Sequence, residues 1–451
     1  MTRWPAQPVI YEINTGIWLV ELSRRYGRQV TLGEVPPGAW DEVALPGIDA
    51  VWLMGVWQRS PAGLRIALRN PQLQASFRDT LPDLTAADIA GSPYCVRGYA
   101  VDDALGGPAG LATARAELAG RGLRLLLDFV PNHVAPDHPW LTDHPDYLIR
   151  GDLDDLARSP DAFLAVGDQV FANGRDPYFP PWPDVVQLNA FSEPLRAATV
   201  DTLAAIGEQA DGVRCDMAML MLTDVFGKTW ADRAGPAPAA EFWSQVIAGV
   251  KHRHPDMLFV AEAYWDLEWA LQQQGFDYCY DKRLYDRLLQ DGAGSVHDHL
   301  LADLDYQAHL VRFLENHDEP RAAATMSPAK QRAATVAIAT LPGATLWHEG
   351  QFEGRRVRPP VFLTRRPDEP VDADLRTFHQ HLLAAVHATG MRTGRWQLLE
   401  VDGWPDNPTH RNLLAWCWTG RDSRHVIVVN LSGAPAQARL PLPWPELSGA
   451  Q

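Results

Sequence analysis

The chain of 451 residues lacks both a long apolar run and an excess of positive charge. No stretch reaches the 18 or so consecutive apolar residues that a transmembrane helix needs. The 40 Lys and Arg residues against 56 Asp and Glu residues give a net charge of −16. Nucleic acids and anionic membranes attract clustered positive charge, so we expect neither as a partner. A neutral substrate fits this composition better.

Cysteine is also scarce, with four residues that are far apart and form no CxxC pair: Cys95, Cys215, Cys279 and Cys417. Reduced thiols in a cytoplasmic protein are the simplest interpretation of this pattern. The first residues, MTRWPAQPVIYEIN, contain no apolar segment of the kind found in a secretory signal. The sequence therefore predicts a cytoplasmic location, and it gives no indication of oligomeric state.

What the chain does contain is a repeated alternation of short β-like runs and longer helical stretches rich in Ala, Leu and Arg. Eight apolar strands interleaved with helices predict an α/β fold, a closed (β/α)8 TIM barrel. The expected strands are Val9–Asn14, Ala50–Trp57, Leu123–Val130, Gly212–Asp216, Leu258–Ala263, Phe276–Asp281, His309–His317 and Ala344–Glu349.

Two regions depart from this alternation. Some fifty residues after the third strand are rich in Asp, Pro and aromatics, as in DPYFPPWPD, which predicts a functional insert. Near the C-terminus, WQLLEV, NLLAWCW and HVIVVNL predict a small antiparallel β domain. The predicted domains are two barrel segments, 1–132 and 186–387, an inserted domain, 133–185, and a C-terminal β-sandwich-like domain, 388–451.

Polar side chains stand at the ends of four expected strands, where barrel enzymes keep their catalytic residues. Taken singly, an Asp at a strand end is more often a helix cap than a catalyst, whereas a Glu within an apolar run is costly to bury. The segments and their polar residues are DFVPNH (Asp128, Asn132, His133), GVRCD (Arg214, Asp216), VAEAYW (Glu262) and FLENHDE (His317, Asp318).

Three carboxylates, an arginine and two histidines in one barrel mouth suit glycoside cleavage. The reaction needs one ionised carboxylate to attack or stabilise the anomeric carbon and one protonated carboxyl to donate to the leaving oxygen. Arg214 can hold Asp216 ionised through charge-assisted hydrogen bonds. Glu262 lies in an apolar strand close to other carboxylates, and both factors raise its pKa.

These four segments, in this order, resemble the four sequence regions of the α-amylase family, glycoside hydrolase family 13. DVVQLN, at 184–189, is similar to a further region of that family at the end of its inserted domain. The likeness extends from the first strand to the C-terminal β domain, and it implies the same barrel architecture.

The resemblance also implies individual roles. Asp216 matches the nucleophile that forms a covalent glycosyl-enzyme, Glu262 the general acid/base, and Asp318 the third carboxylate that binds sugar hydroxyls at the cleavage site. The residues that match the supporting positions of that subsite are Arg214, His133, His317 and, as the stacking tyrosine in SPYCV, Tyr94. The implied outcome is cleavage with retention of the α configuration.

Three positions depart from the family pattern. Cys95 stands where many exo-acting relatives carry an Asp, and Met219 and Leu220 stand where many amylases carry Lys-His, which contributes to acceptor and calcium binding. No cofactor is required by this interpretation. Calcium stays a candidate, with Asn132 as its candidate ligand, while the acidic run at Asp152–Asp155 and the HRH and HDH segments are better explained as solvated surface.

The leading hypothesis is a retaining α-glycosidase that acts on α-linked glucans or maltooligosaccharides by α-amylase-like hydrolysis. The alternative is an α-glucosyl transferase or phosphorylase acting on sucrose, trehalose or a glucosylated small molecule, with a phosphate pocket formed by Arg355, Arg356 and Arg358. A non-catalytic sugar-binding protein fits least, because all three carboxylates are present. Linkage, endo or exo action, and water or sugar as acceptor are not decided by the sequence.

Overall fold

Eight parallel strands close into a barrel in the computed structural model, which describes residues 4–445. The predicted (β/α)8 barrel is therefore confirmed, and each expected apolar run contributes one strand. In chain order the strands are β1 (Val9–Asn14), β2 (Ala50–Met54), β5 (Arg124–Phe129), β11 (Gly212–Cys215), β12 (Leu258–Ala261), β13 (Tyr278–Tyr280), β14 (Leu310–Arg312) and β15 (Ala344–His348).

Alternation along each strand decides which side chains enter the barrel. Leu125 and Leu127 belong to the core between strands and helices, whereas Leu126 belongs to the core inside the barrel. Successive side chains of a strand point to opposite faces, so Asp128 at the end of β5 continues the inward row of Leu126. The same parity directs Glu262, two residues after the inward Val260, into the barrel mouth.

Helices surround the barrel, and their ends carry ordinary capping groups. The Asn14 side chain accepts a hydrogen bond from the Ile17 amide at the start of α1, and Gly27 ends that helix at φ 63°. The longer helices are α1 (Thr15–Tyr26), α3 (Pro61–Arg69), α4 (Pro71–Thr80), α5 (Gly107–Gly120), α8 (Glu193–Gln209), α9 (Thr223–Ala234), α10 (Phe242–Arg253), α12 (Lys282–Gln290), α13 (Ala293–Leu300), α16 (Pro328–Thr340) and α17 (Ala373–Thr389).

Shorter elements complete the barrel shell. The strands β3 (Trp57–Arg59) and β4 (Val96–Val101) pair antiparallel beside it. The short helices are α2 (Pro37–Val43), α11 (Glu268–Gln273), α14 (Leu304–Ala308) and α15 (Ala322–Thr325), with a 3-10 turn at Ala218–Met221. That turn buries Met219, Leu220 and Met221, so most of the methionine-rich run after β11 is core.

The insert after β5 begins and ends in a pair of short antiparallel strands, β6 (His133–Val134) and β10 (Val186–Gln187). Its acidic run is structural, because Asp152 caps α7 and Asp155 forms an ion pair with Arg233 at 2.7 Å. The predicted domain boundaries stay predictions. The other elements of the insert are α6 (Trp140–Asp143), β7 (Arg150–Gly151), α7 (Leu153–Arg158), β8 (Phe163–Val166) and β9 (Gln169–Ala172).

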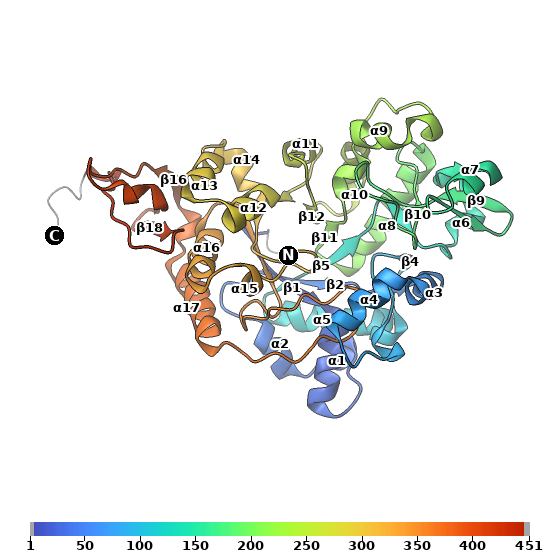
Figure 1. Ribbon diagram of the computed structural model, residues 1–451, viewed down its shortest axis with the longest axis horizontal. Coiled ribbons are helices and arrows are strands. Elements are labelled where there is room, and N and C mark those ends of the chain that lie inside the picture. The colour runs from blue at the N-terminus through green and yellow to red at the C-terminus, as the bar shows by residue number, and fades with distance from the viewer. Residues whose placement is uncertain (1–3, 446–451) are drawn as a thin grey trace.

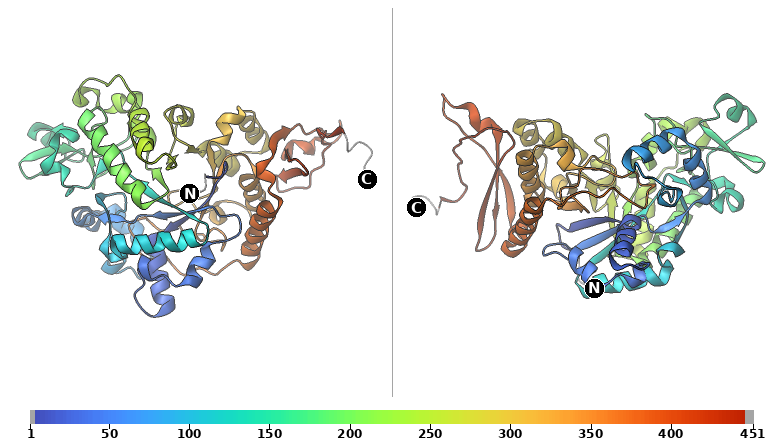
Figure 2. Two further views of the ribbon diagram at one scale, coloured as in Figure 1. Left: turned by 180° about the vertical axis from the view of Figure 1, so that it is seen from behind. Right: turned by 60° about the horizontal axis from the view of Figure 1, so that its bottom comes forward.

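The predicted C-terminal antiparallel sheet is also present, with β16 (Arg395–Leu399), β17 (Leu413–Thr419) and β18 (Arg424–Asn430). Trp418 attaches it to the barrel shell by donating its indole N–H to the carbonyl of Thr340, at the end of α16. The insert and this sheet lie at opposite ends of the long axis of the molecule (Figures 1 and 2).

The four cysteines are buried and unpaired in the structure, as the sequence predicts. Within residues 4–445, no helix is both long enough and apolar enough to cross a lipid bilayer.

Candidate active site

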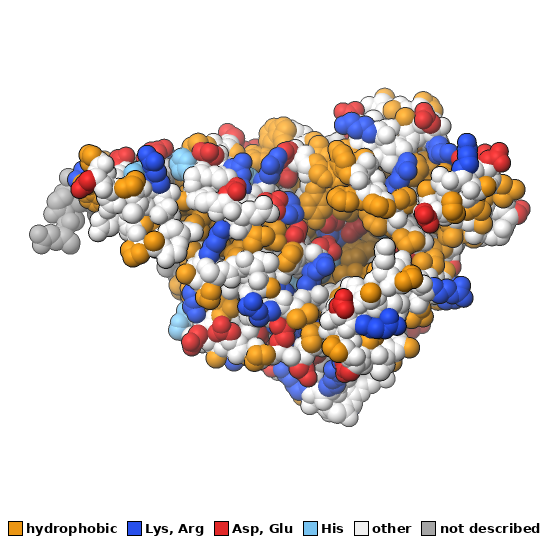
Figure 3. All heavy atoms as spheres, viewed as in Figure 1, with side chains coloured by type: hydrophobic (Ala, Val, Ile, Leu, Met, Phe, Trp, Pro, Cys, Tyr) orange, Lys and Arg blue, Asp and Glu red, His pale blue; other side chains and the backbone are white. Residues whose placement is uncertain are grey.

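A hollow opens near the centre of one face of the molecule, with acidic side chains within it and hydrophobic ones along its walls (Figure 3). The carboxyl ends of β5, β11 and β12 and the loop after β14 bring together the residues that the sequence singles out. Arg214 and Asp216 come from β11 and the residue just after it, Glu262 follows β12, and His317 and Asp318 follow β14.

Arg214 is the centre of this cluster. Its Nη1 donates a hydrogen bond to Asp216 Oδ1 at 2.6 Å, and its Nη2 lies 2.7 Å from Glu262 Oε2. More distant ion pairs join the same guanidinium to Asp128 at 3.7 Å and to Asp318 at 3.9 Å. The side chain is only 1% exposed, so these interactions are weakly screened by solvent. One buried cation therefore orients all the carboxylates of the site.

Aromatic rings enclose the same cation. The guanidinium carbon of Arg214 lies 5.2 Å from the ring of Trp52, 5.4 Å from that of Tyr94 and 5.8 Å from that of Tyr280. A cation over an aromatic face is attracted by the ring quadrupole, an effect that grows when water is excluded. The rings thus hold Arg214 in place and keep the site dry.

Glu262 has the electrostatic environment of a general acid. Burial raises its pKa, the charges of Asp216 and Asp318 raise it further, and Arg214 opposes both, which leaves the pKa at about 7. Two groups donate hydrogen bonds to its carboxyl: the Met217 amide to Oε2 at 2.6 Å and the Tyr264 hydroxyl to Oε1 at 2.8 Å. A carboxyl with this pKa exchanges protons near neutral pH.

The other two carboxyls differ from Glu262 and from each other. Burial raises the pKa of Asp216, but its ion pair and hydrogen bond with Arg214 oppose the rise. For Asp318, burial acts upward but His317 Nε2, 3.0 Å from Oδ2, and Arg214 lower the pKa to about 2. Asp318 is therefore ionised throughout the physiological range.

His317 and Tyr94 form one wall of the cluster. The Tyr94 hydroxyl lies 2.8 Å from His317 Nε2, and the two rings stack with centroids 5.3 Å apart. His317 Nδ1 is paired with Glu12, a buried carboxylate within β1. Burial by itself lowers the pKa of His317, but Asp318 and Glu12 raise it well above 6.5. His317 is thus held as a cation between two carboxylates.

His133 and Asn132 lie at the base of the insert. The His133 ring packs on Trp182 with centroids 5.3 Å apart, and burial lowers its pKa to about 4. Among the described residues it forms no ion pair with the three carboxylates. Asn132 Oδ1 accepts a hydrogen bond from Gln187 Nε2 at 2.9 Å. The amide oxygen proposed for calcium is therefore already engaged by another side chain.

No group of three or more His, Cys, Asp and Glu side chains suited to a metal ion occurs within residues 4–445. His252 lies on α10 and His254 directly after it, whereas the HDH segment, 297–299, lies on α13, where His299 is 3.0 Å from Asp281. Calcium dependence stays a prediction, and the chemistry derived below uses no metal.

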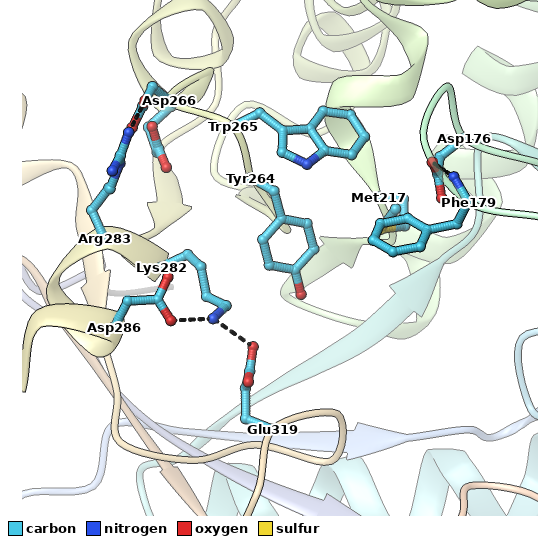
Figure 4. Close-up of a pocket in the computed structure, with 11 residues that line it drawn as sticks. Asp176, Phe179, Met217, Tyr264, Trp265, Asp266, Lys282, Arg283, Asp286 and Glu319 are labelled. Carbon is cyan, nitrogen blue, oxygen red and sulfur yellow. Dashed lines mark hydrogen bonds and ion pairs between the residues drawn. The ribbon is translucent and has the colours of Figure 1, made fainter. Parts of the chain in front are cut away.

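A cavity of about 490 Å³ lies beside Met217 and Tyr264, the two residues that donate hydrogen bonds to Glu262, although Glu262 itself does not line it. Its wall contains Tyr264 and Trp265 from the loop after β12, Met217 from the loop after β11, and Phe179 from the insert (Figure 4). Trp265 has φ 63°, a left-handed conformation that is costly for a bulky side chain and that turns this residue onto the cavity wall.

Solved structures of low identity share this fold. The match to the maltogenic α-amylase AmyB of Thermotoga neapolitana has a TM-score of 0.67 at 20% identity and covers 94% of this chain and 86% of that one. An α-amylase from Lactobacillus plantarum gives 0.68 at 21% identity, covering 95% and 89%. No profile of a known protein family matches the chain.

Curated relatives match the sequence itself. Over 333 residues the chain is 26% identical to the α-amylase MalA of Haloarcula japonica, which covers 71% of this chain and 44% of that protein. The chain is therefore similar to members of the α-amylase family in sequence and in fold. A maltosyltransferase of Burkholderia pseudomallei, named for α-1,4-glucan and maltose-1-phosphate, is 29% identical over 47% of this chain and 16% of its own length. The chain thus spans less than half the length of these relatives.

Two further residues belong to the site although sequence reasoning did not select them. Glu12 is a carboxylate inside the apolar run VIYEIN, the same irregularity that draws attention to Glu262, so it could have been found. Tyr264 has no such signal, because a tyrosine near a strand end is most simply explained as packing.

Proposed function

We propose that the protein is a retaining α-glycosidase that acts on α-linked glucans or maltooligosaccharides. The observation that carries the proposal is the single guanidinium of Arg214, which contacts Asp216 at 2.6 Å and Glu262 at 2.7 Å. Retaining enzymes need their two carboxyl groups about 5 to 5.5 Å apart, whereas inverting enzymes need about 6.5 to 9.5 Å. One guanidinium bridging both carboxyls supports the shorter separation.

In the first step Asp216 attacks the anomeric carbon, and the bond from that carbon to the leaving oxygen breaks. Glu262 gives its proton to this oxygen and is left as a carboxylate. Its pKa of about 7 supports a proton that is present at neutral pH and readily transferred. Attack opposite the leaving group gives a β-linked glycosyl ester on Asp216.

In the second step Glu262, now a carboxylate, accepts a proton from water as the water oxygen attacks the same carbon and the bond to Asp216 breaks. The second inversion restores the α configuration. A sugar hydroxyl in place of water gives transglycosylation by the same route, so the acceptor alone separates the two outcomes.

Binding and distortion of the sugar at the cleavage site are proposed for the remaining residues. Asp318, ionised with a pKa of about 2, can accept hydrogen bonds from sugar hydroxyls. Tyr94 supports this subsite through its stacking on His317, and His133 is proposed to complete it from the insert side. An oxocarbenium-like transition state is stabilised by such negative charge.

The choice of α-linked glucans as substrate is supported by the relatives, whose names include α-amylase and a transferase for α-1,4-glucan. The phosphorylase alternative is not supported. It needs a free cationic pocket, but Arg355 is paired with Glu21, Arg356 donates to the Ala323 carbonyl, and Arg358 donates to that of Asp318.

A cytoplasmic location is proposed on the four buried, unpaired thiols. The functional assignment is tested by incubating the protein with amylose, maltooligosaccharides, sucrose and trehalose and following the anomeric protons of the first products by NMR. We expect release of α-configured maltooligosaccharides from α-1,4-glucans. In Asp216→Asn we expect the hydrolytic activity to fall by at least about 10³-fold. First products in the β configuration, or full activity of Asp216→Asn, would overturn the proposal.

A further inference from the structure

The two oxygens of the Glu262 carboxyl have different partners. Oε2 accepts the Met217 N–H at 2.6 Å and lies 2.7 Å from Arg214 Nη2. Both neighbours of Oε2 are N–H groups, and neither a backbone amide nor a guanidinium can accept a hydrogen bond. A proton placed on Oε2 would therefore face two donors and displace at least one of them.

Oε1 has one partner of a different kind, the Tyr264 hydroxyl at 2.8 Å. A hydroxyl both donates and accepts, so Tyr264 can donate to Oε1 when Glu262 is ionised and accept from it when Glu262 is protonated. The acidic proton of Glu262 can thus be carried by Oε1 alone. The hydrogen bond between Tyr264 and Oε1 is kept whether Glu262 is ionised or protonated.

The Tyr264 hydroxyl also faces the cavity beside Glu262. Its ring lies below Trp265 in Figure 4, and its oxygen points away from that indole toward the middle of the lining residues. Met217 lines the same cavity, so the partners of both Glu262 oxygens lie beside it, and a leaving sugar or an incoming acceptor there would lie next to the Tyr264 hydroxyl.

We propose that Tyr264 is a positioning residue that makes Oε1 of Glu262 the oxygen that gives up the proton in the first step and takes one in the second. The inference rests on the proposed function and adds to it the choice of oxygen and the residue that enforces it. The proton passes from Oε1 to the leaving oxygen, Tyr264 then donates to the bare Oε1, and water later returns a proton to the same atom.

Tyr264→Phe tests this inference, because it keeps the ring and removes the hydroxyl. A hydrogen bond to the carboxylate favours the charged form, so its loss raises the Glu262 pKa. We expect the ¹³C NMR titration of the Glu262 carboxyl, assigned with Glu262→Gln, to move up by about one pH unit. The basic limb of the kcat/KM profile on a maltooligosaccharide should move with it.

The kinetic signature is selective for leaving groups. For maltooligosaccharides, which need protonation, we expect kcat to fall about 10-fold with little change in KM. For α-maltosyl fluoride, whose fluoride leaves without a proton, the first step should be almost unaffected. The matched control is Tyr306→Phe on α14, a tyrosine whose ring packs on Trp269, and it should change neither the titration nor the profile.

An unshifted Glu262 titration in Tyr264→Phe would overturn the inference whether or not the protein turns over a glucan, since it is measured on the free enzyme. Equal losses on maltosyl fluoride and maltooligosaccharide would also overturn it, because they would indicate a structural role. If the Glu262 titration shifts in Tyr264→Phe but the wild-type protein cleaves none of the α-glucans, the contact is supported and the proposed function is rejected.

Discussion

Glu12 and His317, 305 residues apart in the chain, form a buried ion pair beneath the active site. Glu12 lies within β1, the first strand of the barrel, and His317 follows β14, the seventh, so the pair joins these two parts of the barrel. Because His317 also contacts Asp318 at 3.0 Å, the position of the carboxylate that we propose to bind substrate depends on a residue near the other end of the sequence.

Glu12→Gln should destabilise the protein by about 2 kcal/mol, because it removes one of the two carboxylates that stabilise the buried imidazolium of His317. The folded-state pKa of His317 lies above its ordinary value, so the stabilisation is fully present below about pH 6.5 and is lost as pH rises through the folded-state pKa. In urea unfolding from pH 6 to 10, the difference in the free energy of unfolding between wild type and variant should become smaller as the pH rises.

The control for that measurement is Glu42→Gln. Glu42 pairs with Arg25 on the surface, where its side chain is 61% exposed, so the loss should stay below about 1 kcal/mol. If the loss of unfolding free energy in Glu12→Gln stays constant or grows as the pH rises, His317 is not the cation that Glu12 stabilises.

The activity should fall above about pH 7, because the first step needs Glu262 protonated and its pKa is about 7. Measured as kcat/KM, the basic limb reports the free enzyme. Glu262→Gln should remove this limb and should spare maltosyl fluoride more than maltooligosaccharides. Persistence of the limb in Glu262→Gln would assign it to another group.

The barrel and the grouping of Arg214, Asp216, Glu262 and Asp318 could be predicted because both follow from local rules. Apolar runs give the strands, and residues at strand ends meet at the barrel mouth whatever the details of packing. Glu12 follows from the same rule, and only the lack of a motif around it kept it out of the prediction.

The walls of the site could not be predicted in this way. Tyr264 binds one oxygen of Glu262 and is followed by Trp265 and Asp266, which both have positive φ, a conformation that neither residue type favours. Arg358 reaches the Asp318 carbonyl from a loop 40 residues further on. Such contacts depend on how long loops pack, and propensity and periodicity do not determine that.

Trp265→Ala should weaken binding on the leaving-group side of the cut. The indole lies on the cavity wall, and the Tyr178 ring is 4.8 Å from it. Loss of an aromatic face that stacks on a sugar costs about 1.5 kcal/mol of binding free energy, which corresponds to about a 10-fold rise in KM for long maltooligosaccharides. Hydrolysis of maltosyl fluoride should change little. Trp269→Ala, at an exposed position on α11, is the control. Equal effects of the two variants would exclude a binding role for Trp265.

Gly343→Ala should destabilise the barrel by several kcal/mol, about 3 or more. Gly343 precedes β15 with φ 104°, and a Cβ there would lie 2.4 Å from the Leu310 carbonyl oxygen. Gly294→Ala on α13, where a Cβ meets nothing within 4 Å, should be neutral or stabilising. Thermal unfolding of both variants checks this, and similar melting temperatures would contradict it.

The central claim, that Asp216 becomes covalently bound to the sugar, is tested most directly in Glu262→Gln. With α-maltosyl fluoride the first step needs no acid, so it should proceed, whereas the second step lacks its base and should stall. Mass spectrometry of the digested protein should then find one maltosyl group on the peptide that contains Asp216. It should find none in the double variant that carries Asp216→Asn as well as Glu262→Gln. A maltosyl group on any other residue, or turnover of the fluoride that persists without Asp216, would contradict the account.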